Sequence, residues 1–457
     1  MTETRFWCEW GWLGGNRPAH GVLVFATDGL ISAVVTGEPK PPRGSRVLRG
    51  LVLNGVANAH SHVFQRALRG RMERGRGNFW TWRDLMYRAA SALEPDLLHR
   101  LARAVYAEML ESGFTAVGEF HYVHHPLGGG RYRDPNIMGE ALVAAATEAG
   151  VRLTLLDTLY LHGGLSAEGY VPLGLAQARF GDGTVEQWAE RTARLTAAPG
   201  VVTGAAAHSV RAVDPHSLAT LASVATERNL VVHAHVSEQP AENIVTLEHH
   251  GLTPTKVLER AGILGPRFTA VHGIHLSPED SQALGSSGST VCLCPTTEAN
   301  LGDGVGKSVR LLAAGARLCV GSDSQAVVDP LAEARAVEMH ERLVSGVRGV
   351  HDTTELLAAL TTGGYRSLGR SAPDGEPHDP FSIGAPCDLV AVGLGSTRLS
   401  GHDRGSLLEA VVFSATASDV TDVVVDGRVV VNGGRHVTID VAAELTTAIE
   451  QLWDRAP

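Results

Sequence analysis

Eight short apolar runs, separated by helical patterns, constrain the fold of this chain more than any other feature. The runs end near His62, His121, Leu161, His208, Glu238, His275, Pro295 and Asp323. Near-continuous apolar runs are typical of parallel strands that are buried on both faces. With helices between them, they predict an α/β fold, a (β/α)8 TIM-like barrel over roughly residues 50–375. A cap residue followed by proline, as in Asp134-Pro135 or Asp329-Pro330, predicts where several helices begin.

Both ends of the chain have a different pattern, with β-rich runs and tight turns. Asp28-Gly29 separates two such runs near the N-terminus, and Asp426-Gly427 does the same near the C-terminus. We therefore expect the two ends to build one small β-sandwich. The expected domains are residues 1–54 for the N-terminal part of the sandwich, 55–378 for the barrel, and 379–457 for the C-terminal part with a terminal helix.

Composition and charge argue against several classes of protein. Of the 457 residues, 44% are hydrophobic and 19% are charged, which is typical of a folded chain. A formal net charge of −10 without a basic block argues against nucleic acid or an anionic membrane as a partner. Five scattered cysteines and the lack of a signal-peptide pattern predict reduced thiols in a cytoplasmic protein.

Side chains that suit a metal ion occur where the predicted strands end. The C-terminal strand ends of a (β/α)8 barrel meet at one mouth, where active sites lie. His60 and His62 are two residues apart, so on a strand both imidazoles point the same way. Each such residue alone could be a core histidine or a loop cap, but their joint position favours a metal site. We predict one zinc ion, or iron as second choice, held by His60, His62, His235 and Asp323.

Two more side chains at the strand ends complete the predicted chemistry. Zinc lowers the pKa of a bound water to about 7, so that hydroxide forms near neutrality. Asp323 or His272 would accept the water proton, and the sequence leaves this choice open. Glu238 would transfer protons to the leaving group. A second metal in such barrels generally needs a carboxylated lysine at a central strand end, and we expect none there. The lysines of the chain are Lys40, Lys256 and Lys307.

Several longer stretches resemble the formimidoylglutamate deiminases, a family of the amidohydrolase superfamily. These are NAHSHVFQRALRG, FWTWRDLMYR, EFHYVHH, HSVRAV and HAHVSEQPAE, and the similarity extends to DVVVDGRVVVNGG near the C-terminus. The resemblance implies a barrel of the metal-dependent hydrolase type. It also implies zinc-dependent hydrolysis of N-formimino-L-glutamate to N-formyl-L-glutamate and ammonia, as in histidine degradation, by attack of metal-bound hydroxide on the amidine carbon.

The resemblance also implies how the substrate is held. The positions that match the family's substrate-binding residues are Gln65, Arg83, Tyr122, His208 and Arg211. The two arginines suit a small anionic substrate, because a guanidinium pairs with a carboxylate through two parallel hydrogen bonds. The expected assembly is a homodimer.

Two other functions fit the same motifs less well. A deaminase of ring substrates such as cytosine, guanine or adenosine would keep the metal site but needs an aromatic, largely neutral pocket. A non-catalytic barrel that serves as a scaffold would have lost metal ligands, whereas every expected ligand is present.

Overall fold

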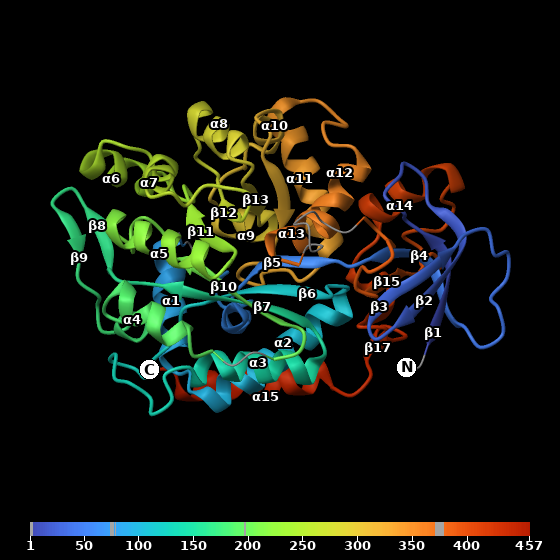
Figure 1. The fold of residues 1–457 in the computed structure, drawn as a ribbon, viewed down its shortest axis with the longest axis horizontal. Helices are drawn as coiled ribbons and strands as arrows, with labels where there is room; N and C mark the ends of the chain where they lie inside the picture. The colour runs from blue at the N-terminus through green and yellow to red at the C-terminus, as the bar shows by residue number, and fades with distance from the viewer. Residues whose placement is uncertain (1–2, 74–76, 78, 196–197, 371–378) are drawn as a thin grey trace.

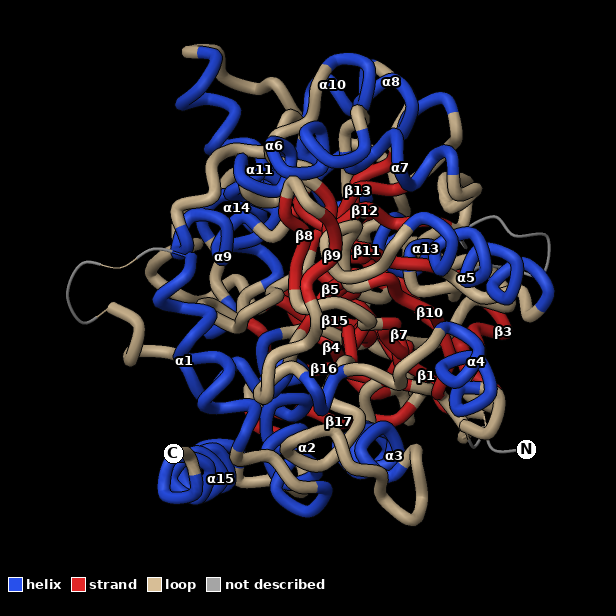
Figure 2. The backbone as a smooth tube through the Cα atoms, turned by 90° about the vertical axis from the view of Figure 1, so that its left-hand side faces the viewer, coloured by secondary structure: helices blue, strands red, loops and turns tan. Residues whose placement is uncertain are grey.

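Eight parallel strands form the centre of the molecule, and helices surround them (Figures 1 and 2). The computed structural model describes residues 3–73, 77, 79–195, 198–370 and 379–457. The barrel strands, which neighbour one another in chain order, are β5 (Ala57–Ser61), β6 (Ala116–His121), β7 (Arg152–Leu159), β10 (Val201–Ala207), β11 (Val232–Val236), β12 (Phe268–His272), β13 (Thr290–Leu293) and β14 (Arg317–Val320). The predicted (β/α)8 barrel is confirmed.

The barrel closes between its first and last strands, at a seam of polar residues. Ser61 of β5 pairs in parallel with Asp323, just after β14. The backbone N–H of Asp323 donates to the carbonyl of His60 at 2.9 Å, and that of His62 donates to the carbonyl of Asp323 at 3.0 Å. Backbone hydrogen bonds therefore hold two halves of the predicted metal site together.

Helices follow the strands and pack against the outside of the barrel. They are α1 (Phe79–Ser91), α2 (Pro95–Ser112), α3 (Ile137–Ala149), α4 (Val185–Thr192), α5 (Pro215–Glu227), α6 (Pro240–His250), α7 (Pro254–Arg260), α8 (Pro278–Ser286), α9 (Pro295–Leu301), α10 (Ser308–Ala313), α11 (Pro330–Ser345), α12 (Thr353–Ala358) and α13 (Gly364–Ser367). No helix in the described part of the chain is long and apolar enough to cross a membrane.

The cap-and-proline rule locates one of the two helix starts named above and misplaces the other. Asp329 caps α11, with its carboxylate accepting a hydrogen bond from the backbone N–H of Ala332. The prediction from Asp134-Pro135 is wrong, because α3 begins at Ile137 with Asn136 as its cap. The Asp134 carboxylate accepts a hydrogen bond from the backbone of Asn136 at 2.9 Å instead, which closes a local turn ahead of the helix.

The two chain ends share one mixed sheet beside the barrel (Figure 1). Its strands, in spatial order, are β18 (Arg435–His436), β17 (Arg428–Asn432), β16 (Val420–Val425), β15 (Leu389–Val392), β4 (Arg46–Asn54), β1 (Thr4–Gly11), β2 (Ala19–Thr27) and β3 (Leu30–Val35). Antiparallel pairing of β15 with β4 joins the two ends, which confirms a β-structure built from both and shows it as one continuous sheet. The expected domain boundary at residue 378 lies outside the described residues.

Three smaller elements complete the fold. The hairpin of β8 (Gly164–Ser166) and β9 (Gly169–Val171) follows β7, and α14 (Leu407–Ser414) precedes β16. The C-terminal helix α15 (Val441–Arg455) lies along α2 at the outside of the barrel (Figure 1). Trp453 anchors this helix to the segment that follows β5, because its indole N–H donates to the carbonyl of Ala67 at 2.9 Å.

A buried ion pair joins the barrel to the mixed sheet. Arg152 of β7 donates to the fully buried Asp388, with Nε and Oδ2 2.5 Å apart. The hydroxyl of Tyr365 donates to the same carboxylate at 2.6 Å, and the backbone N–H of Asp426 donates at 3.0 Å. The barrel and the mixed sheet are therefore joined through the buried carboxylate of Asp388, whose charge these donors stabilise.

Candidate active site

Four buried metal-donor side chains converge at the seam of the barrel. His60 lies near the end of β5, His62 directly follows that strand, His235 belongs to β11, and Asp323 follows β14. Nε2 of His60 lies 3.2 Å from Nε2 of His235 and 3.4 Å from Oδ1 of Asp323. Nε2 of His62 lies 3.5 Å from the same oxygen. The structure therefore brings together the four residues that the sequence singled out.

Hydrogen bonds on the far side of two of these rings determine which nitrogen faces the seam. Nδ1 of His62 contacts the carbonyl of Phe120 at 2.9 Å, and Nδ1 of His235 contacts the carbonyl of His208 at 2.8 Å. Because a carbonyl only accepts, each Nδ1 carries the hydrogen and each Nε2 presents a lone pair. Burial lowers the pKa of His60, His62 and His235, that of His62 to about 3, so all three imidazole rings are neutral.

The spacing of the donors fits a metal ion. In a tetrahedral site with N and O ligands at about 2.0–2.1 Å, neighbouring ligand atoms lie about 3.3 Å apart. The three separations at the seam, 3.2, 3.4 and 3.5 Å, are close to this value. The Nε2 lone pair of His62 faces the carboxylate of Asp323 at 3.5 Å, and a cation between the two would remove their repulsion. Burial favours the neutral form of Asp323, but its hydrogen bond with His60 and the nearby histidines, His272 among them, together outweigh burial and hold its pKa below the usual range.

Glu119 of β6 supports the stretch that carries the first two histidines. Its carboxylate accepts hydrogen bonds from the hydroxyl of Ser61 at 2.8 Å and from the backbone N–H of Val63 at 2.9 Å. Val63 begins a short 3-10 helix, Val63–Leu68, which places Gln65 beside the donors. One buried carboxylate thus orients both the metal-donor end and the next residues of this stretch.

His272, the last residue of β12, connects the donors to a row of carboxylates. Its Nδ1 lies 3.3 Å from Oε1 of Glu298, and its Nε2 lies 3.8 Å from Oε1 of Glu238 and from Oδ2 of Asp323. Burial disfavours the charged ring, but the three neighbouring carboxylates outweigh it and raise the pKa of His272 to about 10. Burial raises the pKa of Glu238 to about 7. A cationic donor and a carboxyl that can hold a proton therefore face the same space.

The backbone is strained where these side chains lie. His272 has a φ of +70°, Asp323 of +43° and Ser237, next to Glu238, of +51°. Residues other than glycine rarely adopt the left-handed region, and such strain is concentrated at functional sites. Three of the strand ends at this mouth thus have conformations that the surrounding fold must impose.

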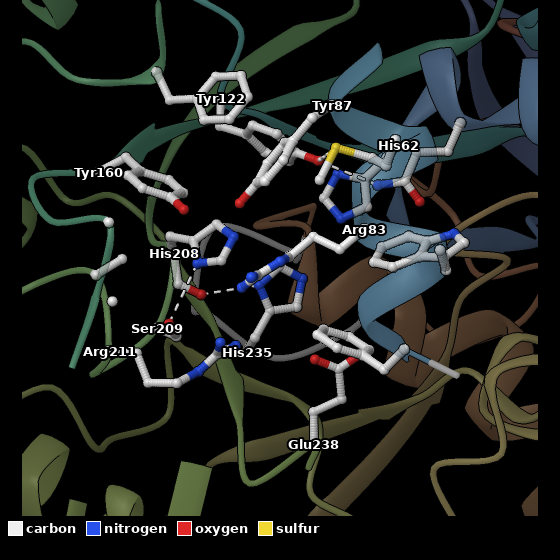
Figure 3. Close-up of a pocket in the computed structure, with 18 of the residues that line it drawn as sticks. His62, Arg83, Tyr87, Tyr122, Tyr160, His208, Ser209, Arg211, His235 and Glu238 are labelled. Carbon is white, nitrogen blue, oxygen red and sulfur yellow. Dashed lines mark hydrogen bonds between the residues drawn. The ribbon is translucent and has the colours of Figure 1, made fainter. Parts of the chain in front are cut away.

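A cavity opens beside the donors (Figure 3). It is lined by every residue predicted to bind substrate: Gln65, Arg83, Tyr122, His208 and Arg211. It is also lined by the predicted catalytic residues and three of the metal donors: His62, His235, Glu238, His272 and Asp323. His60 is fully buried next to His235.

The cavity wall presents polar atoms that no described residue satisfies. Nε of Arg83, Nε of Arg211 and Oε1 of Gln65 are buried and have no hydrogen-bond partner among the described residues. The guanidinium of Arg83 stacks over Trp80, with Cζ 4.4 Å from the ring centroid, so its position on α1 is supported. Leaving buried donors unpaired is costly, and two cationic donors suit an anionic ligand.

Sequence patterns did not indicate three further residues of this region. Tyr87 of α1 and Tyr160, which follows β7, both line the cavity. Tyr160 lies at the end of the third apolar run, so the strand-end rule could have found it. Glu298 lies inside α9, and no motif marks it, because its role depends on the position of His272 in space.

Comparison with known proteins assigns the chain and its fold to one family. The model of the Amidohydrolase family matches residues 51–430. The chain belongs to the amidohydrolase family. This family is metal-dependent. The crystal structure of an amidohydrolase from Brucella melitensis has a TM-score of 0.89 with 32% sequence identity, over 98% of this chain and 100% of that chain.

Relatives of known activity include deaminases and a deiminase. Formimidoylglutamate deiminase of Pseudomonas aeruginosa is 37% identical over 406 residues, which are 86% of this chain and 87% of that protein. An 8-oxoguanine deaminase of the same species is 29% identical over 93% of this chain and 91% of that protein. An adenosine deaminase from Xanthomonas campestris with bound zinc shares the fold, with a TM-score of 0.81 and 21% identity over 99% and 98% of the two chains. The predicted relationship to formimidoylglutamate deiminases is confirmed.

Proposed function

We propose that this protein hydrolyses N-formimino-L-glutamate to N-formyl-L-glutamate and ammonia, a reaction at a C–N bond. One observation carries the proposal: two partly buried arginines, each with a buried Nε that has no partner among the described residues, line the same cavity as the metal donors. The substrate has two carboxylates and an amidine, so it matches two cationic donors beside a hydrolytic centre. The similarity to the deiminase of Pseudomonas aeruginosa supports this choice. We also propose that the protein is a cytoplasmic homodimer and that it binds neither nucleic acid nor a membrane.

One zinc ion, or iron as the alternative, is the proposed cofactor. It would be held by the four donors at the seam, His60, His62, His235 and Asp323. When bound, it would act as a Lewis acid and lower the pKa of water to about 7. Lys256 lies in α7, Lys307 caps α10 and Lys40 precedes β4, so no lysine is available at a strand end for a second ion.

The protein's own residues would move the protons. Asp323 accepts a proton from the attacking water, and His272, which the neighbouring carboxylates keep protonated, donates to the negative charge that develops on oxygen. Glu238, with a pKa of about 7, delivers a proton to the departing nitrogen. The departing nitrogen gains both protons of the attacking water in this way, the one that Asp323 accepted and the one released when the hydroxyl on carbon becomes the carbonyl of the formyl group. The C–N bond then breaks and ammonia leaves.

An ammonia-release assay on a set of substrates tests the proposal. N-formimino-L-glutamate is compared with cytosine, guanine and adenosine derivatives, using protein of measured metal content. We expect turnover of the amidine and loss of activity after a chelator removes the metal. Turnover of a ring substrate alone would favour a ring deaminase. Protein with substoichiometric metal and no chelator-sensitive hydrolysis would favour a scaffold.

Replacing Arg211 by methionine should mainly weaken substrate binding. Methionine keeps an unbranched apolar stem but removes the guanidinium cation that would pair with a carboxylate. Loss of one charged hydrogen bond, about 1.5–3 kcal/mol, corresponds to an increase in KM of about 10- to 150-fold. Steady-state kinetics measure it, with Arg46→Met in the exposed part of the mixed sheet as control. An unchanged KM would show that Arg211 does not bind the substrate.

A further inference from the structure

Gln177 lies behind the part of the cavity wall formed by Tyr87 and Tyr160. Its Nε2 is 3.1 Å from the hydroxyl of Tyr87 and 3.0 Å from that of Tyr160. The same nitrogen donates to the carbonyl of Gly163 at 3.0 Å, while the backbone N–H of Gly174 donates to Oε1 at 3.0 Å. The two backbone contacts determine which end of the amide carries the hydrogens. Toward the two hydroxyls, Gln177 can therefore only donate.

Each tyrosine must then direct its own hydroxyl hydrogen away from Gln177, because an amide nitrogen accepts no hydrogen bond. One tyrosine can donate to the oxygen of the other. The remaining hydroxyl hydrogen has no acceptor within the part of the chain that the structure describes. Both tyrosines line the cavity, so the pair offers at least one hydrogen-bond donor to the ligand that enters (Figure 3).

This hydroxyl pair is close to both cationic side chains of the cavity. Cζ of Arg83 lies 5.7 Å from the ring centroid of Tyr87. Burial raises the pKa of Tyr160, and the charge of Arg211 offsets this only in part, so the hydroxyl keeps its hydrogen. Figure 3 shows Tyr160 and Arg211 on one side of the cavity and Arg83 reaching in from the other. This part of the wall therefore presents a hydroxyl hydrogen next to two guanidinium groups.

We infer that the hydroxyl pair of Tyr87 and Tyr160 donates to a substrate carboxylate and selects a dicarboxylate over its side-chain amide. The inference rests on the proposed function and names how that site tells substrates apart. A carboxylate accepts from the hydroxyl and pairs with the nearby cations, whereas the NH2 group of an amide has no lone pair for that hydroxyl hydrogen and no charge for the guanidiniums. Gln177 is a positioning residue, which turns the hydroxyl hydrogens toward the cavity without touching the substrate.

Kinetics on two substrates test the inference with the double variant Tyr87→Phe/Tyr160→Phe. The substrates are N-formimino-L-glutamate and N-formimino-L-glutamine. We expect KM for the dicarboxylate to rise about tenfold or more, as for one lost charged hydrogen bond, with little change in kcat. The preference for the dicarboxylate should fall by the same factor. An unchanged KM, or equal losses on both substrates, would overturn the inference.

Two further variants keep the test independent of folding. Gln177→Glu is isosteric but accepts hydrogen bonds, so the hydroxyls would turn toward it and the same preference should fall; a preserved preference would contradict the role of Gln177. Tyr132→Phe is the matched control, because its hydroxyl donates to Glu94 at 2.6 Å outside the cavity, and its KM should not change.

A binding experiment separates failure of this inference from failure of the proposed function. If the wild type releases no ammonia from N-formimino-L-glutamate, the proposed function is wrong. Calorimetry with glutarate and its monoamide then decides the inference. A preference for glutarate that disappears in the double variant would uphold it, and a preference that is absent or unchanged would overturn it.

Discussion

Replacing Asp323 by asparagine is expected to lower kcat for ammonia release at least about 10³-fold, the scale of a lost general base. The variant loses a proton acceptor, and it also loses the negative charge of the donor set at the seam. Asparagine fits the site well, because it tolerates the left-handed backbone that Asp323 adopts at φ +43°. The effect should therefore reflect chemistry and not misfolding.

Metal content and thermal unfolding, measured beside the kinetics, separate lost metal from lost proton transfer. Asp422→Asn is the control, since Asp422 lies in the mixed sheet and pairs there with Arg46. It should keep the wild-type kcat. Wild-type kcat in Asp323→Asn would remove Asp323 from the mechanism.

Replacing Arg152 by methionine should lower the free energy of unfolding by about 3–5 kcal/mol, the usual cost of leaving a buried charge without its partner. Asp388 is fully buried, and Arg152 is the cation that pairs with it. The donors that remain, Tyr365 and the backbone of Asp426, carry no charge. Urea unfolding with a constant slope measures the change.

Two comparisons make this result specific to the buried pair. Arg152→Met/Asp388→Asn removes both charges, so it should recover much of the lost stability. Arg100→Met breaks an exposed pair with Asp96 on α2 and should change little, because exposed pairs contribute little. A single Arg152→Met variant as stable as wild type would mean that this pair does not join the barrel to the sheet.

The barrel, and the grouping of candidate metal donors at its mouth, could be predicted because local rules govern both. Buried parallel strands have apolar runs, and alternation on a strand places His60 and His62 on one side. Glu238 and Asp323 follow other runs directly, so the common mouth of a barrel brings them near. The closing seam could not be foreseen, since the pairing of Ser61 with Asp323 depends on how the whole sheet curves.

The residues that the sequence did not reveal act through tertiary contacts. Gln177 lies in a loop, and its orientation depends on the backbone of Gly163 and Gly174. Glu298 acquires its place only because α9 brings it within 3.3 Å of His272. A single residue in a helix or loop has no periodicity or spacing that would distinguish it from a solvated polar side chain.

Identification of the nitrogen product tests the central claim most directly. Metal-loaded protein is incubated with N-formimino-L-glutamate, and ammonia, formamide, N-formyl-L-glutamate and glutamate are quantified together. We expect ammonia and N-formyl-L-glutamate in equal amounts, because Glu238 delivers its proton to the terminal nitrogen of the amidine. Formamide and glutamate would show that the other C–N bond breaks, and they would contradict this account of the site.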